Sequence, residues 1–299
     1  MRSILFVSFL LASSSVWAAD AVTDVDPVGD LPPETADAGR FSLLVGAGVG
    51  FAPVYEGSDE YRAVYFPIIA PSFGATEGKR RFEFRGLDDV RIHALYLDRL
   101  SVGPLLGYSF GRDDDDAARL RGLGDIDSGF VAGGFVNYDF VDTADARIGV
   151  DVSFAAQVTG DDFGRSGFGA TRFRTDTDYG SEIGAALSAD VQATNRLRLA
   201  GRAGVNFASD DYMRTHFGVS RAQSVNSGLA GVGLPAFDAD GGLKDVYVQA
   251  GATYALTERF ELRATLGYSR LVGDAADSPV TADRDQFQGT LGAAYRFRF

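Results

Sequence analysis

The sequence predicts an all-β fold: a transmembrane antiparallel β-barrel of about twelve strands that spans residues 41–299. Three observations predict it. Apolar residues alternate with small or polar ones from Phe41 onward, short and long connections alternate between the strands, and the chain ends in an amphipathic segment whose last residue is Phe299. Because a strand points successive side chains to opposite faces, this alternation indicates strands with one apolar face.

The composition also favours strands over helices. The chain contains 37 Gly, 23 Phe and 12 Tyr, and glycine weakens helices whereas Phe and Tyr favour strands. Beyond the N-terminal segment, no apolar stretch reaches the roughly 20 residues that a membrane-spanning helix needs. Cysteine is absent from the sequence, which excludes disulfides, thiolate metal sites and a cysteine nucleophile.

The first residues have the pattern of a secretory signal peptide, predicted over residues 1–18. Arg2 supplies the positive charge, Ile4–Ala12 forms a short apolar core, and Val16–Ala18 offers small residues for cleavage before Ala19. Loss of Arg2 on cleavage changes the net charge from −13 to −14. An acidic exported protein is a poor nucleic-acid binder, so we expect no nucleic-acid partner.

Residues 19–40 separate the signal peptide from the strands. They are acidic, contain proline and show no periodicity, which predicts a flexible periplasmic segment that precedes the barrel.

Twelve segments carry the two-residue alternation. In the first of them, Val45 and Val49 point to one face while glycines occupy the other. The predicted strands are Phe41–Phe51, Val64–Phe73, Arg80–Arg85, Val90–Tyr96, Leu100–Phe110, Phe130–Phe140, Ala146–Val158, Tyr179–Val191, Leu197–Phe207, Val246–Leu256, Phe260–Val272 and Phe287–Phe299.

The connections between these strands are sorted by length. Short turns are expected at 75–79, 97–99, 141–145, 193–196 and 257–259, and longer, irregular loops at 52–61, 111–128, 159–178, 208–245 and 273–285, with a tight exception at 86–89. In outer-membrane barrels, short turns face the periplasm and long loops face outward. The pattern therefore places both ends of the barrel chain at the periplasmic side.

The two strand faces distinguish a membrane barrel from a soluble β-sandwich or lipocalin-like barrel, which also alternates. The polar face is rich in small residues with scattered charges, which suits a crowded lumen better than a solvated exterior. Charges expected to neutralise one another there are Arg81, Glu83, Arg85, Asp151, Glu182, Arg202, Glu261 and Arg263. Aromatic residues near strand ends, Tyr96 among them, predict interfacial girdles.

The C-terminal segment resembles the closing strand that the bacterial barrel-assembly machinery recognises. Tyr295, Phe297 and Phe299 share one face with Leu291 and Ala293. Because an open strand edge is intolerable in hydrocarbon, we expect this strand to pair with the first one. These features place the protein in the bacterial outer membrane.

Three loop motifs, in order, resemble those of the MipA/OmpV family, the MltA-interacting proteins of the outer membrane. The motif residues are Tyr55, Glu56, Gly57 and Asp59 in the first loop; Gly111, Arg112, Leu120, Gly122, Leu123, Gly124 and Asp125 in the third; and Phe217, Gly218, Val219 and Ser220 in the long late loop. The resemblance implies a scaffold for enzymes that synthesise and cleave murein, with a murein transglycosylase and a peptidoglycan synthase as partners. It brings no catalytic motif.

The sequence predicts no catalytic residue, cofactor or metal site. The sequence contains two histidines, His93 and His216; His93 is expected in the lumen, where Ser101 or Ser109 on the next strand could form a dyad with it. The acidic run 113–116 lacks the spacing of a calcium loop, but it could share divalent cations with lipopolysaccharide. Gly46–Gly50 lies in a strand, so its glycines are expected to allow close packing against lumen side chains.

Three functions remain open at this point. The leading one is the scaffold for murein enzymes that the family resemblance implies, in contact with outer-membrane lipid and lipopolysaccharide. The alternative is a narrow diffusion or export channel, since about twelve strands enclose a lumen between those of filled barrels and open porins. A weaker alternative is a lipid-modifying barrel enzyme.

Overall fold

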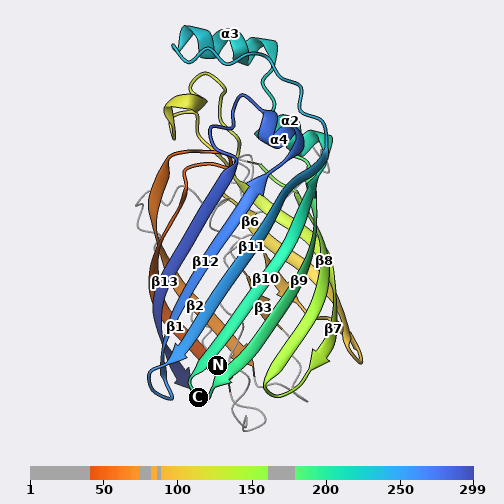
Figure 1. Ribbon diagram of the computed structural model, residues 1–299, viewed down its shortest axis with the longest axis vertical. Coiled ribbons are helices and arrows are strands. Elements are labelled where there is room, and N and C mark those ends of the chain that lie inside the picture. Colours follow the sequence, from red (N-terminus) through yellow and green to blue (C-terminus); the bar gives the residue numbers. More distant parts are fainter. Residues whose placement is uncertain (1–40, 74–81, 86–88, 161–178) are drawn as a thin grey trace, which may run out of the picture.

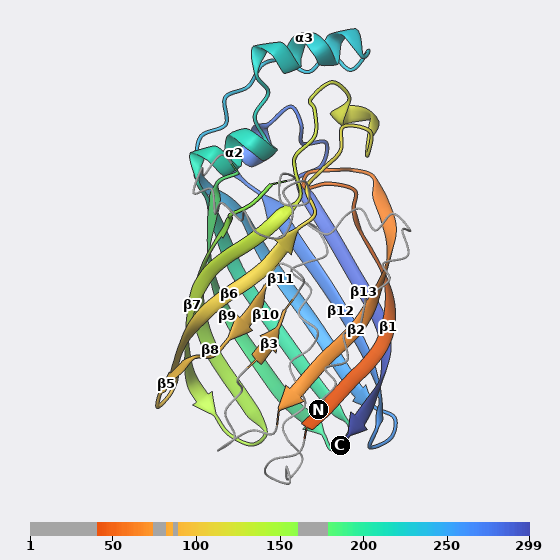
Figure 2. The same ribbon diagram turned by 180° about the vertical axis from the view of Figure 1, so that it is seen from behind.

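One antiparallel sheet curves into a tall barrel, with folded loops above one of its ends (Figures 1 and 2). The computed structural model describes residues 41–73, 82–85, 89–160 and 179–299. The predicted signal peptide, the acidic segment 19–40, Arg81, the turn 75–79 and most of the loop 159–178 lie outside these ranges.

The sheet contains thirteen strands. They are β1 (Phe41–Pro53), β2 (Tyr61–Phe73), β3 (Phe82–Phe84), β4 (Val90–Ile92), β5 (Leu95–Leu97), β6 (Leu100–Ser109), β7 (Gly129–Asp142), β8 (Ala146–Gln157), β9 (Ser181–Thr194), β10 (Leu197–Ala208), β11 (Gly242–Ala255), β12 (Phe260–Leu271) and β13 (Asp285–Arg298). Their order is β2-β1-β13-β12-β11-β10-β9-β8-β7-β6-β4-β3, with β5 also paired to β6. The predicted all-β antiparallel barrel is confirmed.

The last strand pairs with the first, as the closing-strand pattern predicts. Ser42 lies opposite Arg298, and the register runs without a break to Phe51 opposite Gly289. The first and last strands of the barrel therefore begin and end at the same end as the short turns. β2 and β3, the two ends of the strand order, are neighbours in sequence, and residues 74–81 between them lie outside the described ranges.

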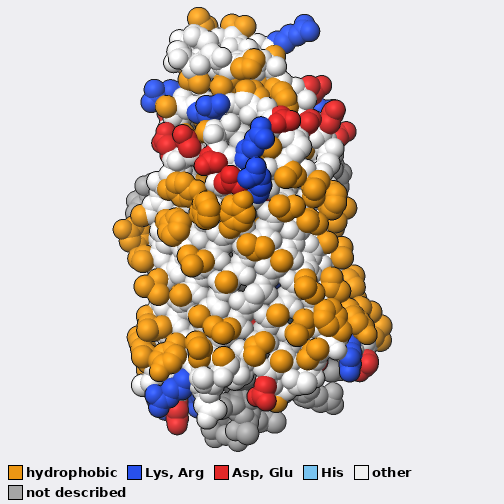
Figure 3. Space-filling model, viewed as in Figure 1, with side chains coloured by type: hydrophobic (Ala, Val, Ile, Leu, Met, Phe, Trp, Pro, Cys, Tyr) orange, Lys and Arg blue, Asp and Glu red, His pale blue; other side chains and the backbone are white. Residues whose placement is uncertain are grey.

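The outward face of the barrel is apolar. On β8, Val150, Val152 and Phe154 are all more than 40% exposed, whereas Asp151 between them is 1% exposed. Figure 3 shows hydrophobic side chains over the barrel wall, densest in two bands near its ends, with charged side chains gathered beyond both bands. This is the distribution that a hydrocarbon layer bounded by two interfaces selects. No helix in the described ranges is long and apolar enough to cross a membrane.

The predicted strand Val90–Tyr96 is instead two short strands, β4 and β5, separated by a β-bulge. Arg91 pairs with Leu105, but Leu95 pairs with Val102, so one extra residue is accommodated opposite Gly103. Gly103 makes this possible because a β-carbon there would lie 1.7 Å from the Ile92 carbonyl oxygen.

The bulge also reverses the expected direction of one aromatic side chain. Tyr96 lies opposite Ser101 and stacks on His93, so it points into the barrel. The prediction of an interfacial position for Tyr96 is therefore wrong, because strict alternation does not hold across an extra residue.

The sequence predicts irregular long connections, but three of these connections carry helical elements. A 3-10 turn (η2, Ala118–Leu120) lies between β6 and β7, α2 (Asp210–His216) and α3 (Arg221–Leu229) lie between β10 and β11, and α4 (Gly273–Asp277) lies between β12 and β13. We call residues 54–60, 110–128, 209–241 and 272–284 the lid, because they gather above one end of the barrel (Figures 1 and 2).

Inward glycines on β1 and β13 make room for bulky side chains from β2, as the sequence predicts for the run Gly46–Gly50. A β-carbon at Gly48 would lie 2.3 Å from the ring of Phe66, and one at Gly292 would lie 2.7 Å from Ile68. Leu44, Ile68 and Ala294 form a buried cluster against Phe66. This part of the lumen is therefore apolar and filled.

Substituting Gly48→Ala should destabilise the barrel by about 1–3 kcal/mol, because the new methyl group would overlap the Phe66 ring. The urea midpoint of the folded protein in lipid vesicles measures this loss. Gly201→Ala on β10 is the matched control, because its nearest neighbour would be an oxygen 3.9 Å away. Equal midpoints for the two variants would contradict the packing argument.

Candidate functional site

A cluster of charged side chains crosses the middle of the lumen. Asp151 on β8 accepts a hydrogen bond of 3.1 Å from each of Arg85, Arg91 and Arg202. Glu83 and Asp89 pair with Arg85 and Arg91, at 3.0 and 2.8 Å. We call these six residues the lumen cluster; its three guanidinium groups and three carboxylates balance one another.

The lumen cluster links parts of the barrel wall that are far apart in the strand order. Arg85 and Arg91 come from the short segments at β3 and β4, Asp151 from β8, and Arg202 from β10. Arg202 also donates to the Tyr247 hydroxyl on β11, at 2.9 Å. Asp151 and Arg91 are 1% exposed, and a buried charge is tolerable only when paired and hydrogen-bonded. The predicted neutralisation of inward charges is confirmed for Glu83, Arg85, Asp151 and Arg202; Arg81 lies outside the described ranges.

Further charge pairs lie in the lumen toward the short-turn end. Glu261 accepts hydrogen bonds from Arg263 at 2.6 Å and from Arg296 at 3.2 Å. Arg198 on β10 pairs with Asp190 on β9 at 3.2 Å. The expected pairing of Glu261 with Arg263 is confirmed, and Arg296 is a second partner of Glu261 that the sequence does not predict.

His93 joins the lumen cluster to a serine. Its ring nitrogens lie 3.1 Å from Ser101 Oγ and 3.1 Å from Glu83 Oε2. Of the two serines expected near His93, the structure therefore selects Ser101; Ser109 lies at the opposite end of β6. The sequence does not predict the contact between Glu83 and His93. The contact depends on the bulge and on the pairing of β3 with β4, and neither has a signal in the sequence.

Lys244 joins the lid to the barrel rim. Its ammonium group contacts Glu182 at 2.6 Å and Glu56 at 2.7 Å, and it lies 4.8 Å from the ring centroid of Tyr212 on α2. Asp245 is a further contact at 3.5 Å. The sequence predicts that Glu182 pairs with other lumen charges. In the structure Glu182 pairs with Lys244, which lies at the start of β11 and within the predicted loop 208–245.

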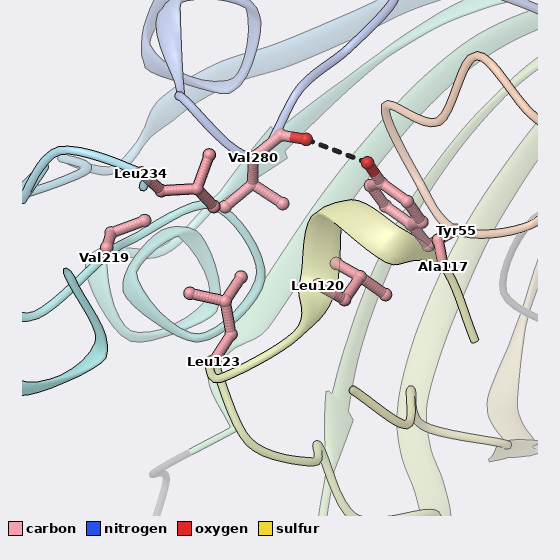
Figure 4. Packing of buried hydrophobic residues seen from close by; sticks show 7 residues of the cluster. All are labelled: Tyr55, Ala117, Leu120, Leu123, Val219, Leu234 and Val280. Carbon is pink, nitrogen blue, oxygen red and sulfur yellow. Dashed lines mark hydrogen bonds between the residues drawn. The ribbon is translucent and has the colours of Figure 1, made fainter. Parts of the chain in front are cut away.

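The lid has its own hydrophobic packing. One cluster draws Tyr55, Leu120, Val219 and Val280 from four separate loops, and the Tyr55 hydroxyl donates to the Val280 carbonyl at 3.0 Å (Figure 4). Burial raises the pKa of Tyr55 to about 12. Since each loop supplies only a few apolar residues, the loops are ordered by packing against one another.

A second cluster anchors the lid to the top of the barrel. Met213 of α2 and Phe217, directly after α2, pack on Leu271 at the end of β12 and on Ala275 of α4. Both side chains are buried: Phe217 is 0% exposed and Met213 is 1% exposed.

The family-like motif residues converge in this lid. Tyr55, Leu120, Leu123, Phe217 and Val219 are buried in its two clusters. The other members shape the backbone or hold contacts. Gly57, Gly111, Gly122 and Gly124 have positive φ; Gly218 donates its amide N–H to the Arg214 carbonyl; Glu56 binds Lys244; Arg112 donates to the His216 carbonyl; Asp125 accepts from the Asp114 amide; Ser220 caps α3; and Asp59 is exposed.

The acidic run 113–116 folds back on the chain. Asp116 accepts from the Asp113 amide, and Asp114 accepts from the Gly122 amide. Burial, and then repulsion from Asp116, raise the pKa of Asp113. No group of three His, Asp or Glu side chains that could hold a metal ion occurs in the described part of the chain.

The barrel, its apolar belt and its lid define an integral outer-membrane β-barrel, and comparisons with known proteins identify the family. Residues 45–297 match the family model described as MltA-interacting protein MipA. The chain therefore belongs to the MipA family, as its loop motifs predict. A region of 102 residues is 32% identical to "Putative outer membrane protein YiaT" of Escherichia coli (strain K12), covering 34% of this chain and 39% of that protein. Neither description names a reaction.

Solved outer-membrane barrels resemble the chain at a lower level. The outer membrane channel DcaP of Acinetobacter baumannii aligns with a TM-score of 0.39 and 10% identity over 88% of this chain and 99% of DcaP. The NanC porin aligns with a TM-score of 0.41 and 11% identity over 85% of this chain and 98% of NanC. Likeness at this level carries no information about function.

Removing the central carboxylate should leave three buried arginines without their shared partner. Asp151→Asn is expected to lower the free energy of unfolding by about 3 kcal/mol, the scale for breaking a buried ion pair. Asp142→Asn is the control, because its pair with Arg147 is exposed and should contribute less than about 1 kcal/mol. Urea unfolding in vesicles measures both; a similar small loss for each would contradict the role of Asp151.

Acid should loosen the lid. Burial, with the charges of Arg112 and Lys244, lowers the pKa of His216 well below its usual value. The unfolded lid therefore binds a proton more readily than the folded lid, so this contribution to stability is complete above about pH 6.5 and is lost as the pH falls below it. Hydrogen exchange of the α2 amides should accelerate from pH 7 to pH 5, after correction for the intrinsic rate.

The variant His216→Gln isolates this effect from the titration of lid carboxylates. Its corrected exchange rates should change less over the same pH range. An unaltered pH dependence in the variant would assign the loosening to other groups.

Proposed function

We propose that this protein is a closed outer-membrane platform that holds murein-processing enzymes at the short-turn end of its barrel. The family's description as MltA-interacting proteins supports an interaction with a murein transglycosylase. The lumen cluster supports a closed barrel, because paired charges that join β3, β4, β8 and β10 fill the middle of the lumen. A lid packed over the other end adds a second obstruction.

The short-turn end faces the periplasm in this proposal, as in other outer-membrane barrels. Only brief turns protrude there from the described residues, such as Asp98–Arg99 and 143–145. A stable protein interface needs about 800 Å² per partner, which such turns supply poorly. We therefore assign much of the contact with a murein enzyme to residues 19–40.

Co-isolation tests this assignment. The detergent-extracted protein should retain a murein transglycosylase or a peptidoglycan synthase, and deletion of residues 22–38 should weaken retention by about tenfold, or 1.4 kcal/mol. A deletion of residues 222–233 in the lid, at the opposite end, is the control and should leave binding intact. Undiminished binding without residues 22–38 would contradict the assigned route, and no binding by the full chain would contradict the platform itself.

The lid faces the cell surface in the same orientation. We assign to the family motifs the task of building this lid, since their apolar members fill its cores. Its exposed carboxylates, such as Asp115 and Asp238, suit contact with lipopolysaccharide through shared divalent cations. Calcium-dependent retention of lipopolysaccharide by the purified barrel is the expected result, and retention unaffected by a chelator would contradict it.

A gated channel is the second candidate. The observation that favours it is the charged character of the lumen cluster, because a permanently filled barrel could use apolar side chains at lower desolvation cost. Two arginines of the lumen cluster, Arg85 and Arg91, come from the segments around β3 and β4, and each of these strands is three residues long. Discrete conductance steps at modest voltage across a planar bilayer would favour the channel, whereas a silent bilayer would favour the platform.

A further inference from the structure

Three side chains with the roles of a nucleophile, a base and an orienting carboxylate meet inside the barrel. Ser101 Oγ lies 3.1 Å from His93 Nδ1, and Glu83 Oε2 lies 3.1 Å from His93 Nε2. They come from β6, the bulge after β4, and β3. A hydroxyl and a carboxylate on opposite nitrogens of one imidazole are the geometric signature of an activated serine.

The hydrogen-bonding capacities of the three groups determine where the proton lies. An ionised carboxylate can only accept, so a neutral His93 must carry its proton on Nε2 and donate it to Glu83. Nδ1 is then left with its lone pair, which accepts the Ser101 hydroxyl. His93 is thus held in the tautomer that can remove the serine proton.

The surrounding structure fixes the imidazole ring. Tyr96 stacks on it at 5.6 Å between ring centroids, and Phe135 meets it edge-on at 4.8 Å. The bulge opposite Gly103 points both His93 and Tyr96 inward, which an unbroken strand would not do. Arg91 lies over the same Phe135 ring, 5.0 Å from its centroid, and so holds that ring in place.

We propose that Ser101, His93 and Glu83 form a nucleophilic site that hydrolyses short acyl esters reaching the lumen from the short-turn end. Ser101 is the second residue of β6, directly after the turn at Asp98–Arg99, so this end offers the shorter path. Small esters are the matching class because Ser101 and His93 are buried, at 3% and 8% exposure.

The chemistry is balanced by water alone. Ser101 Oγ attacks the ester carbonyl carbon while its proton passes to His93 Nδ1, and Glu83 stabilises the resulting imidazolium. The ester C–O bond then breaks, and the leaving alcohol takes the proton from His93. Water, activated by the same nitrogen, hydrolyses the acyl-serine to a carboxylic acid and restores the hydroxyl.

A small organophosphate, diisopropyl fluorophosphate, tests the site on the folded full-length barrel. We expect one covalent adduct, mapped to Ser101 by peptide mass spectrometry and absent in Ser101→Ala. Ser109→Ala is the control that keeps the adduct, because Ser109 lies at the opposite end of the same strand. His93→Ala should slow modification by at least about 100-fold, the usual scale of general-base catalysis.

Glu83 acts through His93 and is a positioning residue, so its test uses a conservative pair. Glu83→Gln should slow modification more than Glu83→Asp, with the heat-dependent gel shift of both variants unchanged to show that the barrel is folded. An unmodified Ser101 in the folded wild-type protein, or an equal rate in His93→Ala, would overturn the proposal. Equal rates in the two Glu83 variants would overturn the role of Glu83. None of these outcomes bears on the binding of murein enzymes, which is assigned to residues 19–40 and not to the lumen.

Discussion

The Asp151 carboxylate is the contact on which the interior of this barrel depends. It lies on the inward face of β8 with no exposed side-chain surface and holds three guanidinium groups at once. Without it, Arg85, Arg91 and Arg202 would be like charges crowded into a region poor in water, and the short strands β3 and β4 would lose their link to the opposite wall. Repulsion among the three guanidinium groups and the cost of their desolvation would then both destabilise the folded barrel.

The separation of the two strand faces explains how a chain with 23% charged residues forms a membrane barrel. The wall presents its apolar side chains outward, so the charges and glycines are placed in the lumen. Glycine at positions such as 48 and 292 lets Phe66 and Ile68 fill one side, and ion pairs fill the other. The barrel interior is thus mixed: it is apolar where Phe66 and Ile68 pack against β1 and β13, and ionic in the lumen cluster and around Glu261.

The lid is a second folded unit built on the same chain. Its loops cannot be stable singly, because each contributes only a few apolar residues to the two clusters. Lys244 fastens them to the rim through Glu56 and Glu182. The apolar residues through which the chain resembles its family lie in this packing.

Much of the fold could be predicted from the sequence because the two-residue alternation and the aromatic closing strand are local signals. The bulge after β4 could not be predicted, because it depends on Gly103 of the neighbouring strand. This bulge makes Tyr96 point inward instead of outward. The folded lid was missed because its apolar residues are dispersed over four loops and show no period. The pairing of Lys244 with Glu56 and Glu182, and of Arg296 with Glu261, could not be predicted because these partners lie 35 or more residues apart in the sequence.

A double-mutant cycle between Asp151 and Arg91 tests most directly the claim that ion pairs across the lumen hold the barrel together. Unfolding free energies in vesicles would be measured for the wild type, Asp151→Asn, Arg91→Gln and the double variant. The structure predicts a coupling energy of roughly 2 kcal/mol, as expected for buried groups in direct contact. Single-variant losses that add to within about 0.5 kcal/mol would show that the two residues are energetically independent, and would contradict the account.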